Sequence, residues 1–195
     1  MSTPNVTPAI PCTLHAHGRV MNGGFRIDFR NDGETDARFQ VRSSTDVPRT
    51  YTVEAGHSLS GWWDGVAETD EYDFSVQGPN GFLRNFRGTL SGADSRVVDI
   101  SASYDIHAQD VLLRLSNPTC QELIVSIFDR HKSRTTVFVI DPGESESRRW
   151  TVQRTDGWYD LTVTVGGNGR FATQLAGHVE NVEDRISQPL MARLV

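Results

Sequence analysis

Residues 78–88 read Gly-Pro-Asn-Gly-Phe-Leu-Arg-Asn-Phe-Arg-Gly, a sequence typical of a tight turn that leads into a β-strand. Pro79 fixes φ at an early turn position, whereas Asn80 and Gly81 both tolerate backbone conformations that most residues avoid. Apolar and polar residues alternate on both sides of this turn, from Tyr72 to Val76 before it and from Phe82 to Arg87 after it. The stretch therefore predicts a β-hairpin, with Arg84 on the same strand face as Phe82 and Phe86.

The same pattern returns at residues 159–171, which read Tyr-Asp-Leu-Thr-Val-Thr-Val-Gly-Gly-Asn-Gly-Arg-Phe. A shift of roughly 86 residues also aligns Phe25–Asn31 with Val111–Asn117 and, with small slips in loops, Trp63 with Trp150. Gly88 falls near Gly177 in the same comparison. The chain therefore contains two copies of one unit, and the hairpin marks each copy.

Short alternating segments separated by turn residues predict an all-β fold of two tandem immunoglobulin-like β-sandwich modules. In the first copy the expected strands include Leu14–His17, Phe25–Arg30, Phe39–Arg42, Thr50–Val53 and Ser58–Trp63, and no helix of ordinary length is expected there. We place the modules at residues 8–92 and 93–181, after a linker or start segment at 1–7. The tail at 182–195 is expected to be irregular or a short helix.

Composition excludes several classes of protein. Of the 195 residues, 37% are hydrophobic and 23% are charged, as in an ordinary globular protein. The net charge is −6, and each half of the chain, divided after Gly92, carries −3, which argues against nucleic acid as a partner. We find no apolar run of the length that a membrane-spanning helix needs, and the N-terminus has none of the features of a signal peptide.

The two cysteines, Cys12 and Cys120, lie far apart in the sequence and lack the spacing of a metal site. They could form one disulfide in an oxidising compartment or remain free thiols. The sequence leaves both possibilities open.

Two groups of residues have some character of a metal site. His15 and His17 share one face of a strand, although their repeat partners Ser101 and Ser103 are not ligands, so we interpret this face as solvated. Four acidic residues of a single loop could bind Ca²⁺ through oxygen ligands, although their spacing is not that of an EF-hand: Asp64, Glu68, Asp70 and Glu71. A solvated acidic loop is the simpler interpretation, and we predict no metal and no cofactor.

The chain also lacks the short motifs of common catalytic sites. It has no G-x-S-x-G, no H-E-x-x-H and no phosphate-binding P-loop. We therefore predict that this chain alone is not an enzyme.

Three segments of the first copy together resemble the C-terminal repeat of bacterial phosphocholine-preferring phospholipases C: residues 39–43, 48–56 and 72–88. The resemblance covers nearly the whole chain and is weaker in the second copy, where Gly167 replaces Pro79. In this family two such repeats follow a long N-terminal catalytic domain. The resemblance thus implies a non-catalytic accessory region of a secreted enzyme that cleaves phosphatidylcholine-type lipids, with that catalytic domain as its partner. No catalytic residue of the family corresponds to a residue here.

In a lipid-handling protein, exposed aromatic and basic side chains become candidate binding residues. Adjacent strand residues point to opposite faces, so we expect Trp63, which repeats as Trp150, to be in the core and Trp62 to be exposed. An exposed Trp62 could contact the bilayer interface or bind a choline head group by cation–π attraction, with packing between sheets or domains as the alternative. Arg84 and Arg87 could meet lipid phosphates or form surface salt bridges.

A different hypothesis is a stand-alone β-sandwich module for binding or adhesion, with a membrane, choline or a glycan as its ligand and no enzyme attached. Glycan binding by the chain would favour it over the accessory region.

Overall fold

The computed structural model describes residues 13–44, 46–64, 70–92 and 97–180, which form fourteen β-strands and one short 3₁₀ turn. The strands of the first module are β1 (Leu14–Met21), β2 (Gly24–Asn31), β3 (Ala37–Ser43), β4 (Arg49–Val53), β5 (Ser58–Trp63), β6 (Glu71–Gln77) and β7 (Leu83–Thr89). Those of the second are β8 (Asp99–Asp105), β9 (Asp110–Ser116), β10 (Leu123–Asp129), β11 (Arg134–Ile140), β12 (Ser145–Thr151), β13 (Trp158–Val165) and β14 (Asn168–His178), with η1 (Gln153–Thr155) between β12 and β13. The predicted all-β class is confirmed, and each copy contains seven strands.

The predicted hairpin is β6–β7, and its turn has the expected chemistry. Phe82 N donates to Pro79 O at 3.0 Å, and Asn80 and Gly81 have φ of 53° and 71°. Two successive positive φ angles inside a four-residue turn are typical of type I′, whose twist matches that of a hairpin. Local sequence is sufficient to specify this element.

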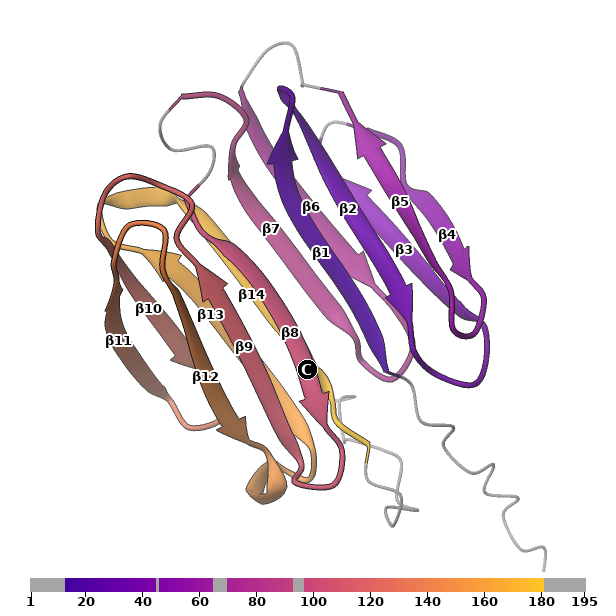
Figure 1. Ribbon diagram of the computed structural model, residues 1–195. Coiled ribbons are helices and arrows are strands. Elements are labelled where there is room, and N and C mark those ends of the chain that lie inside the picture. The colour runs from indigo at the N-terminus through magenta and orange to yellow at the C-terminus, as the bar shows by residue number, and fades with distance from the viewer. Residues whose placement is uncertain (1–12, 45, 65–69, 93–96, 181–195) are drawn as a thin grey trace, which may run out of the picture.

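Each module is a sandwich of a three-stranded front sheet and a four-stranded back part (Figure 1). The front sheets are β1-β2-β5 and β12-β9-β8. In both modules the fourth strand pairs with the third, β4 with β3 and β11 with β10, and so joins the back layer. This differs from the constant-type immunoglobulin arrangement, in which the fourth strand belongs to the sheet of the first two.

Equivalent buried residues confirm the duplication. Asn31 and Asn117 each donate from Nδ2 to a carbonyl at the end of the fourth strand, Val53 O at 3.0 Å and Ile140 O at 2.9 Å. Each module also has its own hydrophobic cluster. A buried polar side chain that bonds two segments in the same way in both copies is a property of the common fold.

The two back layers are continuous, which the sequence did not predict. Strands β7 and β14 pair antiparallel and make one eight-stranded sheet of order β11-β10-β13-β14-β7-β6-β3-β4 (Figure 1). Asn85 lies opposite Gln174 and donates to its Oε1 at 2.8 Å. Since these two residues are repeat equivalents, the modules associate around a pseudo-twofold axis, as two subunits do in an isologous dimer.

This pairing predicts how the first module behaves alone. A chain that ends after Gly92 would expose β7 as an unpaired sheet edge, which is a template for another strand. We expect such a chain to dimerise through β7, in the manner of β7 with β14, when measured by light scattering during gel filtration. A monodisperse monomer of the truncated chain, at concentrations where it is folded, would contradict this role for β14.

Candidate functional site

Arg84 lies at the seam between the modules and is almost completely buried, with 1% of its surface exposed. Its Nη1 donates to Leu83 O at 2.7 Å and Ala176 O at 2.9 Å, and its Nη2 donates to the hydroxyls of Tyr104 and Tyr159. The guanidinium carbon also lies 4.2 Å from the centre of the Phe82 ring. The proposed contact with lipid phosphates is therefore wrong for Arg84, because the second module covers it.

The partners of Arg84 are neutral oxygens, and within the described ranges no carboxylate forms an ion pair with it. Burial raises the pKa of the Tyr104 hydroxyl well above its usual value, and the charge of Arg84 opposes this shift. Tyr104 therefore remains neutral near pH 7. A buried charge without a counterion needs hydrogen bonds to replace its lost hydration. Because the hydrogen-bond acceptors of Arg84 come from both modules, this cluster fixes the two modules against each other.

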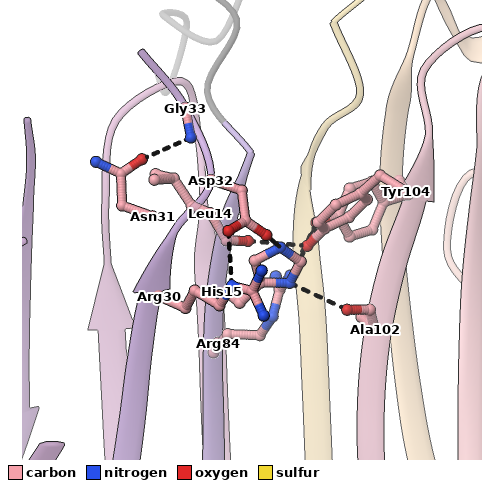
Figure 2. Close-up of polar contacts among 10 residues, drawn as sticks. Leu14, His15, Arg30, Asn31, Asp32, Gly33, Arg84, Ala102 and Tyr104 are labelled. Atoms are coloured by element: carbon pink, nitrogen blue, oxygen red, sulfur yellow. Dashed lines mark hydrogen bonds and ion pairs between the residues drawn. The ribbon is translucent and has the colours of Figure 1, made fainter. Parts of the chain in front are cut away.

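His15 lies beside this cluster and also joins the two modules (Figure 2). Its Nδ1 is 3.1 Å from Ala102 O, across the seam, and its Nε2 is 3.2 Å from Asp32 Oδ2, without the geometry of a hydrogen bond. Burial lowers the pKa of His15, while the Ala102 carbonyl and Asp32 oppose that effect. The interpretation of this strand face as solvated is wrong for His15, because the β8 strand packs against β1.

A groove with a volume of about 490 Å³ separates the two front sheets on the outer side of His15. His17 and Arg30 contribute to one wall, and Ser101, Ser103 and Arg114 contribute to the other. Arg30 already donates to Asp32 at 2.6 Å, and burial lowers the pKa of His17 to about 4, with the charges of His15 and Arg84 adding to the effect. Near pH 7 this groove can offer polar contacts from neutral groups, from the Arg30–Asp32 ion pair and from Arg114.

The structure separates the residues predicted to bind a head group. Trp63 is buried at 5% exposure and Trp62 is exposed at 37%, as the alternation predicted. Trp62 belongs to the front sheet and donates from Nε1 to Asp64 Oδ1 at 2.6 Å. Arg87 is exposed on the back sheet, and Arg84 is buried between the modules. The three residues therefore do not form one site.

The acidic loop is only partly described, since Glu68 lies outside the described residues. Asp64 accepts from Trp62, Asp70 accepts from Ser91 Oγ at 2.6 Å, and Glu71 pairs with Arg170 at 3.5 Å. Within the ranges that the structure covers, there is no group of three or more His, Cys, Asp or Glu side chains suited to a metal ion.

Cys120 is exposed in the loop between β9 and β10. Cys12 lies outside the described residues, so the pairing of the two cysteines remains a question raised by the sequence.

The hairpin turn also contacts the second module, which gives a testable prediction for Gly81. A Cβ at Gly81 would lie 2.7 Å from the Trp158 ring, and the residue has φ of 71°. Gly23 has a similar φ of 76° but nothing within 4 Å of such a Cβ, which makes it a matched control. We expect Gly81→Ala to lower the free energy of unfolding by about 1 kcal/mol more than Gly23→Ala, in urea titrations. Equal losses would mean that the Trp158 ring accommodates the added methyl group at no cost in stability.

Sequence reasoning missed the partners of Arg84, namely Tyr104, Tyr159 and the Ala176 carbonyl. One signal was available, because Arg84 alternates with Phe82 and Phe86 on the face that becomes the core. The identity of its partners depends on pairing between the modules, which local pattern does not encode.

Comparison with known proteins accounts for the duplication. Residues 7–89 and 98–178 each match the family described as bacterial phospholipase C, C-terminal domain. The chain belongs to this family. Its relatives include the non-hemolytic phospholipase C of Burkholderia pseudomallei, 34% identical over 191 residues, and that of Pseudomonas aeruginosa, 31% identical over 195 residues. The hemolytic phospholipase C of Pseudomonas aeruginosa is 30% identical over 215 aligned residues.

These matches include most of this chain but only part of each relative. They cover 94%, 94% and 95% of the chain, against 27%, 28% and 29% of the respective relatives. The chain thus spans just over a quarter of the length of these phospholipases C. As a separate observation, no helix in the described ranges is long and apolar enough to span a membrane.

Proposed function

We propose that this chain is the non-catalytic C-terminal accessory region of a secreted bacterial phospholipase C that hydrolyses phosphatidylcholine-type lipids. One observation carries the proposal: both modules match the C-terminal domain of that family, and the relatives are more than three times longer. The chemistry then belongs to the N-terminal catalytic domain, which is the partner of this region in the parent chain. The parent is exported with its own signal peptide.

The fold suits a rigid support for another domain. The eight-stranded sheet and the buried cluster around Arg84 join the modules, so a domain that docks on either module would be held relative to both.

The isolated chain tests the non-catalytic role directly. Incubated with phosphatidylcholine vesicles, and separately with a soluble phosphocholine ester, it should release no phosphocholine above the buffer rate. Turnover that a single substitution within the chain abolishes would overturn the proposal, whereas turnover that survives every substitution would indicate a contaminant.

The exposure of Trp62 favours a second candidate function, in which this region itself recognises lipid head groups. An exposed indole can lie at a bilayer interface or bind a quaternary ammonium group. Co-sedimentation with phosphatidylcholine vesicles would compare the unchanged chain with Trp62→Ala. Loss of binding in the variant supports this function, and equal binding by both proteins removes Trp62 from it.

A further inference from the structure

Strands β10 and β11 lie at one edge of the eight-stranded sheet (Figure 1). Their outer face carries a cluster of exposed apolar side chains. Ile124, Phe128, Val137 and Val139 are 49%, 40%, 59% and 46% exposed. Ile124 lies directly opposite Val139, and Ser126 lies opposite Val137 between Ile124 and Phe128. These four side chains, which we term the β10–β11 face, therefore form one apolar surface.

The first module shows that the fold does not require apolar residues at these positions. Val41 pairs with Val76 in the first module as Ile127 pairs with Val163 in the second, which fixes the structural equivalence of β3 with β10. The residues equivalent to Ile124, Phe128, Val137 and Val139 are then Arg38, Arg42, Thr50 and Thr52. Since the same sheet folds with polar residues in one copy, the apolar residues of the other copy need a different explanation.

A basic turn adjoins the apolar face. Between Phe128 and Val137 the chain reads Asp-Arg-His-Lys-Ser-Arg-Thr-Thr, and Arg130, His131, Lys132 and Arg134 are all exposed. Arg130 and Lys132 pair with Asp160 and Asp129, whereas within the described ranges no ion pair involves Arg134. Two permanent cations thus lie in the turn and a third, Arg134, begins β11, in a chain of net charge −6. The corresponding turn of the first module contains the acidic Asp46 and no basic residue before Arg49.

We propose that the β10–β11 face and its basic turn bind the surface of a phospholipid bilayer. Apolar side chains beside cations match the two layers of such a surface, because the acyl boundary accepts the first and lipid phosphates attract the second. The choice of phospholipid as partner rests on the proposed role in a phospholipase. Trp62 projects from the front sheet, so a planar bilayer on this back face does not contact it.

Vesicle co-sedimentation of the full 195-residue chain tests the proposal, with phosphatidylcholine vesicles that contain or lack phosphatidylglycerol. The double variant Val137→Thr/Val139→Thr copies the first module and keeps β-branched residues, so it preserves strand propensity. We expect it to weaken binding roughly tenfold. The reverse variant, Thr50→Val/Thr52→Val, is the matched control and should bind as the unchanged chain does, because Arg38 and Arg42 flank the two valines and prevent a continuous apolar surface.

A second variant tests the contribution of the basic turn. Lys132→Gln/Arg134→Gln should weaken binding to the vesicles with phosphatidylglycerol and reduce its dependence on salt, while Trp62→Ala should leave binding unchanged. The proposal would be overturned if Val137→Thr/Val139→Thr bound as tightly as the unchanged chain. It would also be overturned if the unchanged chain bound neither kind of vesicle. The second result would indicate that another protein segment covers the face. Neither readout involves lipid hydrolysis, so failure here is distinguishable from failure of the proposed function.

Discussion

Replacement of Arg84 by alanine should lower the free energy of unfolding by about 3 kcal/mol in urea titrations. The substitution removes a buried guanidinium, leaves the Ala176 carbonyl without this donor and takes one hydrogen bond from each of the Tyr104 and Tyr159 hydroxyls. Each buried polar group left unpaired costs about 1–3 kcal/mol, and the vacated volume adds to the loss. Four tryptophans, two in each module, make fluorescence a suitable probe of the transition.

Arg87→Ala is the matched control, because Arg87 is exposed on the outer face of the same strand. A surface substitution of this kind should change the free energy of unfolding by less than about 0.5 kcal/mol. Similar losses for both variants would mean that the Arg84 cluster does not hold the modules together.

Acidification should destabilise the protein through His17, whose folded-state pKa is lowered to about 4, first by burial and then by the charges of His15 and Arg84. Between pH 4 and 6.5 the unfolded chain binds more protons at this residue than the folded chain does. The contribution of His17 to the free energy of unfolding is therefore largest above about pH 6.5, falls as the pH drops and levels off below about pH 4. This shift in pKa corresponds to a loss of roughly 3 kcal/mol at most in the free energy of unfolding.

Carboxylates also titrate in acid, so the measurement is the difference between two proteins. The free energy of unfolding of His17→Gln should fall less between pH 7 and pH 4 than that of the unchanged chain. His131→Gln, at an exposed position in the β10–β11 turn, should follow the unchanged chain. If His17→Gln also follows the unchanged chain, His17 is not the group that responds.

The fold was predictable from sequence wherever local chemistry determines it. The turn at Pro79–Gly81, the alternation on both sides of it and its recurrence in the second copy were enough for the strands and the duplication. The junction of β7 with β14 was not predictable in this way, because any sheet edge could pair with any other and the sequence gives no register between distant strands. The sandwich modules were expected, whereas their shared sheet was not.

The same distinction between local pattern and contact between the modules applies to the candidate residues. Alternation correctly placed Trp63 inside and Trp62 outside, since this property belongs to a single strand. The charge of Arg84 predicts exposure, whereas its position among apolar neighbours predicts burial, and that burial depends on Tyr104 and Tyr159 from the other module. The burial of His15 likewise depends on the other module, because Ala102 covers it across the seam. The β10–β11 face is evident only from a comparison of the two modules, because the strand registers show that Val137 occupies the position of the polar Thr50.

We propose that these modules assist a phospholipase C without performing its chemistry. The most direct test is phosphocholine release by the complete protein encoded by the reading frame that contains this chain, compared with a version that lacks residues 13–180. We expect both to cleave a soluble phosphocholine ester, while the shortened version loses turnover on phosphatidylcholine vesicles. Full vesicle turnover without these residues would contradict the accessory role, and no phosphocholine release by the complete protein would contradict the phospholipase assignment.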